Sequence, residues 1–272
     1  MPDFFRLNAL RIAQPLLHCI ANQVTANDCA NLALAVGASP IMAHAPEEAA
    51  DIAALCDAAV LNIGTPTEEL FRACLLCGKT VRQKGRPLIL DPVGIGASPW
   101  RLRRVRELLG TCPPSILRAN YAEVLALLGT SSAEHGVDSA EAADTDKRDA
   151  AVKLSRQISA VVLLSGKEDL ITDGNLVWRI SGGSSQMRRI TGTGCMLSIL
   201  CGAFAAVEQN AAQAAVLASA FWKVCAGAAE RHSGELGGFH MALLNAAGNL
   251  TGASFSRDVS NFAIEIVSSV AE

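Results

Sequence analysis

The chain has 272 residues, of which half are hydrophobic and 18% are charged, and its formal net charge is −3. A chain of this size can bury a large core, and its charge gives no electrostatic reason to expect nucleic-acid or anionic-membrane binding. No apolar run reaches the length of a membrane span without interruption, and the N-terminus lacks the pattern of a signal peptide. We therefore expect a cytoplasmic protein with one domain, residues 1–272.

The nine cysteines are an odd number and are scattered through apolar segments. Cys74 and Cys77 have the CxxC spacing, but they lie inside a helical pattern with no second pair of cysteines or histidines nearby. This favours buried, reduced thiols over a zinc or redox site, and reduced thiols are typical of the cytosol.

The first half of the chain alternates short apolar segments with helical patterns. The predicted strands are residues 15–20, 38–43, 58–63, 86–91 and 114–119. The helix patterns between them start at helix-capping signals, which include a possible capping box over Thr65–Glu68 and the pair Ser98-Pro99. Strands that alternate with helices predict a mostly parallel sheet covered by helices on both faces.

The second half begins with a polar stretch, residues 130–149, which we predict to be a long surface loop. A strand is predicted at 158–166, followed by an antiparallel hairpin whose turn is Asp173-Gly174. From residue 190 to the C-terminus the pattern predicts helices only.

A glycine-rich turn, Gly192-Thr193-Gly194, opens the long apolar run that begins at Met196. Glycines allow a tight turn and a close approach to a ligand, and a helix N-terminus attracts anions. The motif alone is equally compatible with a plain turn in which Thr193 caps the helix. Polar residues also follow several predicted strands, where ligands of parallel sheets bind, and this coincidence favours a site.

Four segments together resemble the hydroxyethylthiazole kinase family of the ribokinase-like superfamily. Thr191–Cys195 is similar to the superfamily's anion-hole motif, with cysteine where most members have aspartate, and Asn120–Glu123 is similar to its N-x-x-E motif. Residues 19–22 with 38–43, and Leu90–Gly94, resemble the thiazole kinases specifically. The resemblance runs from about residue 15 to residue 206 and continues more weakly to the C-terminus.

The resemblance implies ATP-dependent phosphorylation of the primary alcohol of 4-methyl-5-(2-hydroxyethyl)thiazole, a reaction of thiamin salvage, with Mg²⁺ as cofactor and ATP as co-substrate. It implies a ribokinase-like α/β fold with a central, mostly parallel sheet, helices on both faces and no separate lid. It also implies a homotrimer whose active sites lie at the subunit interfaces.

Site residues are carried over from the family position by position. The resemblance implies a role in phosphoryl transfer for Gly192, Thr193, Gly194 and Cys195. It implies thiazole binding by Met42, Asn22 and Gly194, and ATP binding by Arg118, Ser165 and Asn120. It places the magnesium ion, through water, near Asp91 and Glu123. The chain departs from the family at Ala119, where glycine is usual, and at Ser165, where threonine is frequent.

Elementary chemistry leaves two roles open for Cys195. At a helix N-terminus its pKa should be depressed, so that its thiolate could accept the proton of the alcohol. The loose transition state of phosphoryl transfer hardly needs a base early, however, and Cys195 could instead only orient the hydroxyl. Glu123 also has a structural alternative, because with Asn120 it has the spacing of a capping box.

Three other functions remain open. They are a kinase for another small alcohol, a ribokinase-like dehydratase that repairs hydrated NADH, and a non-catalytic nucleotide-binding module. An aspartate at the end of the glycine turn would favour the first two, and Cys195 counts against both. The chain lacks a G-x-x-x-x-G-K-[ST] motif, which excludes a Walker-type nucleotide site.

Overall fold

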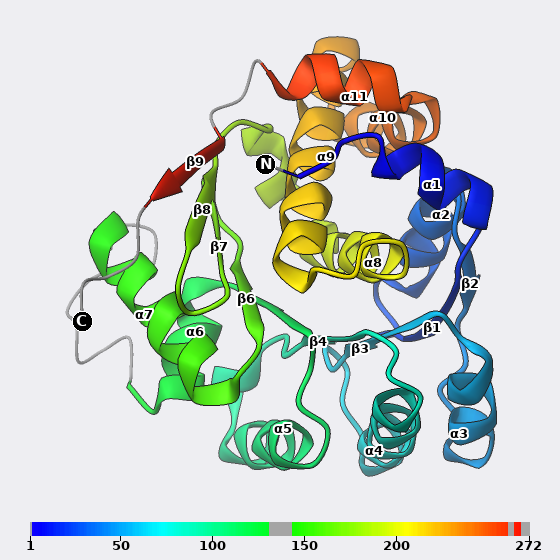
Figure 1. Ribbon diagram of the computed structural model, residues 1–272, viewed down its shortest axis with the longest axis vertical. Coiled ribbons are helices and arrows are strands. Elements are labelled where there is room, and N and C mark those ends of the chain that lie inside the picture. The colour runs from blue at the N-terminus through cyan, green and yellow to red at the C-terminus, as the bar shows by residue number, and fades with distance from the viewer. Residues whose placement is uncertain (1, 131–142, 261–263, 268–272) are drawn as a thin grey trace.

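The computed structural model describes residues 2–130, 143–260 and 264–267. Within these residues nine strands form one sheet in the order β2-β1-β3-β4-β5-β6-β7-β8-β9 (Figure 1). The strands are β1 (Leu16–Ile20), β2 (Ser39–Ile41), β3 (Ala58–Asn62), β4 (Leu88–Asp91), β5 (Ile116–Ala119), β6 (Val161–Leu164), β7 (Asp169–Thr172), β8 (Val177–Ile180) and β9 (Ile264–Val267).

Helices cover both faces of this sheet (Figure 1). One face carries α1 (Arg6–Ala13), α2 (Ala26–Val36), α8 (Thr193–Ala205), α9 (Ala211–His232), α10 (Leu236–Asn249) and α11 (Gly252–Val259). The other carries α3 (Pro46–Leu55), α4 (Glu68–Gln83), α5 (Pro99–Thr111), α6 (Tyr121–Leu128) and α7 (Asp144–Ile158). Two short 3₁₀ helices, η1 (Ile95–Ala97) and η2 (Ser185–Arg189), lie in connections.

The strands from β2 to β6 pair in parallel, and β6 to β9 pair antiparallel. The predicted α/β class, with a mostly parallel sheet between two helical layers, is therefore confirmed, with an antiparallel edge added. The hairpin is also confirmed, since Thr172 pairs with Val177 across a turn in which Gly174 has a φ of 91°.

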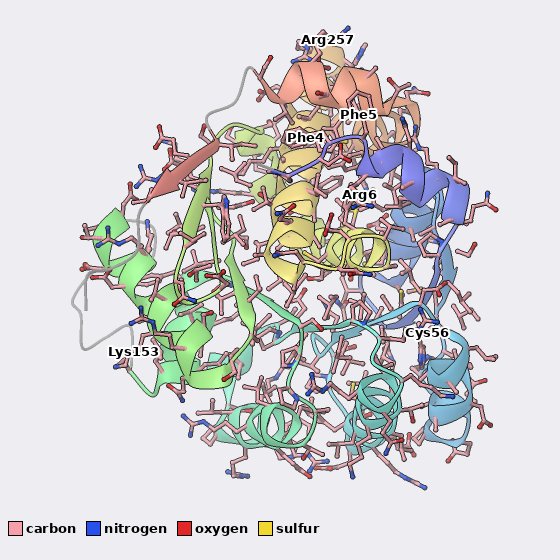
Figure 2. All side chains as sticks on the ribbon, viewed as in Figure 1. Phe4, Phe5, Arg6, Cys56, Lys153 and Arg257 are labelled. Atoms are coloured by element: carbon pink, nitrogen blue, oxygen red, sulfur yellow. The ribbon has the colours of Figure 1, made fainter. Side chains whose placement is uncertain are left out.

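Each face of the sheet has its own hydrophobic core, and side chains fill the space on both sides (Figure 2). Successive strand residues point to opposite faces, so in β3 Val60 enters one core and Leu61 enters the other. Helix α9 is long and apolar enough to cross a membrane by length and composition, although no run of that kind is expected from the sequence. Because 78% of the most apolar 18-residue stretch of α9 is buried inside the protein, α9 is a core helix.

Four sequence predictions about the elements are wrong in detail. The chain is not wholly helical after residue 190, because β9 pairs antiparallel with β8 and so covers its outer edge. Helix α4 is capped by Thr67, whose Oγ1 accepts from the Leu70 N–H, whereas Thr65 Oγ1 accepts a hydrogen bond from the Gln23 N–H.

Within the predicted 130–149 loop, residues 131–142 lie outside the described part of the chain, and α7 begins at Asp144. That helix buries Val152 and Leu154 against the sheet and runs on to Ile158. The following strand is consequently shorter than predicted, because the apolar residues before Val161 belong to the helix end and its turn.

Candidate active site

A chain of buried polar side chains lies at the carboxyl edge of the parallel strands. Asn62 and Asp91 are register partners at the ends of β3 and β4, and Asn62 Nδ2 donates to Asp91 Oδ2 over 2.9 Å. Asn22, just beyond β1, donates from Nδ2 to Asn62 Oδ1 at 2.9 Å. Ser198 of α8 donates to Asp91 Oδ2 at 2.7 Å. The sheet therefore brings the predicted residues Asn22 and Asp91 into one network.

Arg118 on β5 continues this network. Its Nη1 lies 3.5 Å from Asp91 Oδ1, and its Nη2 donates to Ser165 Oγ at 2.5 Å. Burial alone would lower the pKa of Arg118, but the Asp91 and Glu123 carboxylates outweigh it and raise that pKa, so the guanidinium stays charged. Its Nε is buried and has no partner among the described residues.

The glycine turn stands next to this guanidinium. A Cβ built on Gly194 would lie 2.4 Å from Arg118 Nη2, and one built on Gly192, whose φ is 85°, would lie 2.6 Å from Thr25 Cγ2. At Gly192 the left-handed backbone and the nearby Thr25 favour glycine, and a side chain at position 194 would have to displace the Arg118 guanidinium. Thr193 is not a cap: Gly192 occupies the cap position of α8, and Thr193 Oγ1 donates to the Met187 carbonyl at 3.0 Å.

Cys195 follows in the first turn of α8, where it is 9% exposed. Its Sγ accepts a hydrogen bond from Asn22 Nδ2 at 3.4 Å. Burial, followed by the negative charge of Asp91, raises the pKa of Cys195, which corrects the prediction of a depressed pKa. A helix dipole is worth about 1 kcal/mol or less at most termini and does not offset these effects here. Cys195 is therefore a neutral thiol near pH 7.

Glu123 forms the predicted capping box with Asn120. Asn120 Oδ1 accepts from the Glu123 N–H, and Glu123 Oε2 accepts from the Asn120 N–H, both at 2.9 Å. Glu123 Oε1 accepts a further hydrogen bond from the Gly94 N–H at 2.9 Å, which ties α6 to the turn after β4. Burial and the nearby Asp91 charge raise the pKa of Glu123, while Arg118 opposes the shift.

Asp91 and Glu123 are the acids available to a divalent cation at this edge. The described residues contain no group of three or more histidine, cysteine or acidic side chains arranged to hold a metal. Mg²⁺ keeps several waters and binds through one or two carboxylates and the phosphates of its substrate, so two hard oxygen ligands fit it.

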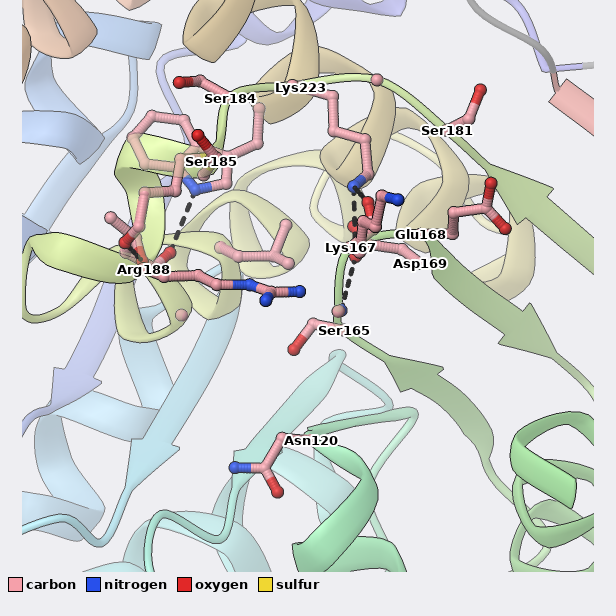
Figure 3. Close-up of a pocket in the computed structure, with 18 of the residues that line it drawn as sticks. Asn120, Ser165, Lys167, Glu168, Asp169, Ser181, Ser184, Ser185, Arg188 and Lys223 are labelled. Carbon is pink, nitrogen blue, oxygen red and sulfur yellow. Dashed lines mark hydrogen bonds and ion pairs between the residues drawn. The ribbon is translucent and has the colours of Figure 1, made fainter. Parts of the chain in front are cut away.

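A cavity of about 840 Å³ opens beside the network (Figure 3). Its walls come from the ends of β5 and β6, the β6–β7 turn, the segment 181–188 and the start of α8. Of the predicted site residues, the structure brings these to its lining: Arg118, Asn120, Ser165, Thr193 and Gly194. The others lie outside the lining: Asn22, Met42, Asp91, Glu123, Gly192 and Cys195. Met42 is half-buried just after the edge strand β2 and packs against the core.

Comparison with known proteins shows which family the chain belongs to. The model of the hydroxyethylthiazole kinase family matches residues 7–252. The hydroxyethylthiazole kinase of Nitratidesulfovibrio vulgaris (strain DP4) is 43% identical over 237 residues, which are 87% of this chain and 88% of that protein. The chain belongs to the hydroxyethylthiazole kinase family.

Family membership makes the chain a kinase and confirms the expected ribokinase-like fold. The structure of the hydroxyethylthiazole kinase protein from Pyrococcus horikoshii OT3 aligns with a TM-score of 0.88 at 31% identity, covering 97% of this chain and 98% of that one. The pyridoxal kinase of Staphylococcus aureus in complex with ADP aligns with a TM-score of 0.61 at 13% identity, over 78% of this chain and 87% of that one. The second likeness concerns the fold alone.

The site also contains residues that sequence reasoning missed. Lys223 of α9 is buried, with Nζ 3.4 Å from Asp169 Oδ1 and donating to the Lys167 carbonyl at 3.1 Å. Ser219 Oγ donates to Asp169 Oδ2 at 2.7 Å, and Trp222 Nε1 donates to the Thr193 carbonyl at 3.0 Å.

Two signals in the sequence could have found these residues. Ser219, Trp222 and Lys223 have the i, i+3, i+4 spacing of one helix face. A lysine inside so apolar a helix is itself informative, because lysine is almost never fully buried without a partner. Asn62 could have been found in the same way as Asp91, as a polar residue at the end of an apolar strand.

Proposed function

We propose that this chain transfers the γ-phosphoryl group of ATP to the primary alcohol of 4-methyl-5-(2-hydroxyethyl)thiazole. The alcohol oxygen forms the new bond to phosphorus, the bond to the β-phosphate oxygen breaks, and ADP leaves. The proton of the alcohol passes to a phosphoryl oxygen or to water. Residues 1–272 act as one catalytic domain in this proposal.

The observation that carries the proposal is the position of Arg118 at the amino end of α8. Its guanidinium lies where a Cβ of Gly194 would be, at the edge of the large cavity. Phosphoryl transfer is accelerated mainly by positioning and by neutralising charge on the moving group. The N–H groups of Gly192, Thr193, Gly194 and Cys195 and the Arg118 fork supply hydrogen-bond donors of the required kind.

ATP would occupy the cavity, with Asn120, Ser165 and Arg118 among its contacts. Asp91 and Glu123 would hold Mg²⁺, with water molecules between them and the ion. When bound, Mg²⁺ neutralises charge on the phosphate oxygens and fixes their geometry. Glu123 is fixed for this role by its backbone hydrogen bonds, and Asp91 by Asn62 and Ser198.

Cys195 orients the substrate hydroxyl rather than removing its proton. A thiol whose pKa is raised by burial is a poor base at neutral pH, and the loose transition state does not require one early. Asn22, which donates to Cys195, and Gly194 lie next to this position and would contact the thiazole. Met42, half-buried just after the edge strand β2, would contact the thiazole at a subunit interface of a homotrimer.

The test is a turnover assay with Mg-ATP and the thiazole alcohol. We expect the thiazole monophosphate and ADP in equal amounts, loss of turnover on chelation of Mg²⁺, and recovery on its return. Light scattering should give the mass of a trimer, and fractionation should place the protein in the cytoplasm. An absence of product above the no-enzyme control would overturn the proposed kinase activity. If the protein phosphorylated pyridoxal or a sugar but not the thiazole alcohol, the proposed substrate would be wrong.

A further inference from the structure

Four cationic side chains line the large cavity: Arg118, Lys167, Arg188 and Lys223. Two of them are neutralised inside the protein, Arg118 by Asp91 and Lys223 by Asp169. Within the described chain, no hydrogen bond or ion pair engages the head groups of Lys167 and Arg188. Lys167 and Arg188 are therefore the two cations of the lining that no carboxylate of the described chain pairs with, whereas Arg118 shares its guanidinium between Asp91 and the cavity.

Arg188 is the better placed of the two. It is exposed to solvent on η2, and Figure 3 shows its side chain extending from that helix into the cavity, toward the side where Ser165 lies. It also lines a neighbouring cavity of about 630 Å³, which shares Asn120 and Ser165 with the first. Arg188 therefore lies along the wall where the two cavities adjoin.

The backbone on which Arg188 stands is anchored to the proposed catalytic turn. Thr193 Oγ1, in the first turn of α8, donates to the carbonyl of Met187, the residue before Arg188. Ser184, which caps η2, donates to Glu230 Oε1 of α9 at 2.7 Å. The backbone that carries Arg188 is therefore held against the glycine turn, while its guanidinium has no partner in the described chain and can bind a ligand.

We propose that Arg188 binds the phosphate chain of the nucleotide as a second arginine, across the cavity from Arg118. The proposal rests on ATP being the phosphoryl donor. A guanidinium presents a planar fork of N–H donors that matches phosphate oxygens two at a time. The Arg118 fork is shared with Asp91 and Ser165, whereas the Arg188 fork has no competing partner in the described chain. Arg188 therefore contacts the phosphates as soon as ATP binds, before phosphoryl transfer, and so contributes to the affinity for ATP.

The experiment is calorimetric titration of the full-length protein with ATP and, separately, with adenosine, in the presence of Mg²⁺. For Arg188→Ala we expect ATP to bind about 10- to 100-fold more weakly, the range for loss of charged hydrogen bonds. Adenosine, which has no phosphate, should bind as it does to the wild type. Arg188→Lys keeps the charge without the fork and should fall between the two. Arg231→Ala removes the same charge from an exposed position of α9 outside both cavities and should not change ATP binding.

An ATP affinity of Arg188→Ala within twofold of the wild type would overturn the proposal. An equal loss of adenosine affinity would also overturn it, because Arg188 would then contact the nucleoside. Titration needs no turnover, so a wild type that binds ATP but makes no thiazole phosphate would defeat only the proposed function. A wild type that fails to bind ATP would defeat both.

Discussion

Two buried ion pairs with the same construction each contribute a cation to the lining of the cavity. Asp91 pairs with Arg118, and Asp169 pairs with Lys223. Each carboxylate also accepts a hydrogen bond of 2.7 Å from a serine of a core helix, Ser198 of α8 or Ser219 of α9. Both pairs are therefore rigid and desolvated.

The cations differ in what they are free to do. Lys223 forms an ion pair with Asp169 and donates to the Lys167 carbonyl, and these contacts hold the turn between β6 and β7. Arg118 reaches beyond its carboxylate to Ser165 and to the space over Gly194, and its Nε has no partner among the described residues. We infer that the Asp169 pair holds the wall of the cavity, while the Asp91 pair presents charge to its contents.

The largest effect should come from filling the space beside Arg118. Gly194→Val places a side chain where the Arg118 guanidinium lies, so it should displace the cation and obstruct the turn. We expect kcat/KM to fall by about 10³-fold, as for the loss of a transition-state donor. Gly110→Ala is the control, because nothing lies within 4 Å of its Cβ. Full activity of Gly194→Val would place the anion hole elsewhere.

Conservative exchanges of the two cations should separate their roles. Arg118→Lys keeps a charge near Asp91 but cannot also reach Ser165 in the same way, so kcat/KM should fall about 10²-fold with little loss of stability. Lys223→Arg keeps the pair with Asp169 and should retain turnover. Steady-state kinetics and urea unfolding measure both. If Lys223→Arg lost as much activity as Arg118→Lys, the distinction between the two pairs would be wrong.

Removing the second pair should act on stability instead. Lys223→Met leaves Asp169 buried without its cation, and breaking a buried pair costs about 3 kcal/mol or more. Urea unfolding should show this loss, and Lys153→Met on the exposed face of α7 should not. The Lys167 carbonyl also loses its hydrogen-bond donor, so the turn between β6 and β7 should become less ordered. ATP affinity should fall as a result, because this turn lines the cavity. A Lys223→Met protein as stable as the wild type would mean that α9 does not hold this wall.

The alternation of elements and the ends of the strands were readable from the sequence. Apolar segments that end at Asp91 and Arg118 predicted strands of a mostly parallel sheet, and the carboxyl ends of such strands meet at one edge. Asn62, at the end of another of these strands, was missed. The glycines at 192 and 194 predicted a tight turn and a close approach to a ligand. The structure shows close packing against Thr25 and Arg118, and the approach to a ligand stays a prediction. The roles of the individual site residues stay predictions.

The errors lie where distant parts of the chain meet. The pKa of Cys195 depends on its burial at the start of α8 and on Asp91, which is more than a hundred residues away in sequence. Reasoning from the helix N-terminus alone therefore gave the wrong direction of the pKa shift. Lys223 acquires its role only when α9 packs beside β7. The strand β9 pairs with β8, a distant part of the chain, and its four residues fell within the run predicted as helical.

Cys195→Ser should have the smallest effect and tests the neutral thiol directly. Serine keeps a small hydrogen-bonding group beside Asn22, so kcat/KM should fall less than about 10-fold, the loss of one neutral hydrogen bond. Because burial raises the pKa of Cys195 above the ordinary 9.0, wild type and variant should have pH–rate profiles of the same shape up to about pH 9.

A thiol with a raised folded pKa stabilises the protein fully below the unfolded pKa and loses that contribution as pH rises through the folded value. The difference in unfolding free energy between wild type and variant should therefore change only in alkaline solution. If the wild-type rate instead rose with a pKa near 7 and Cys195→Ser lost that rise, Cys195 would act as a thiolate base and not as a neutral thiol.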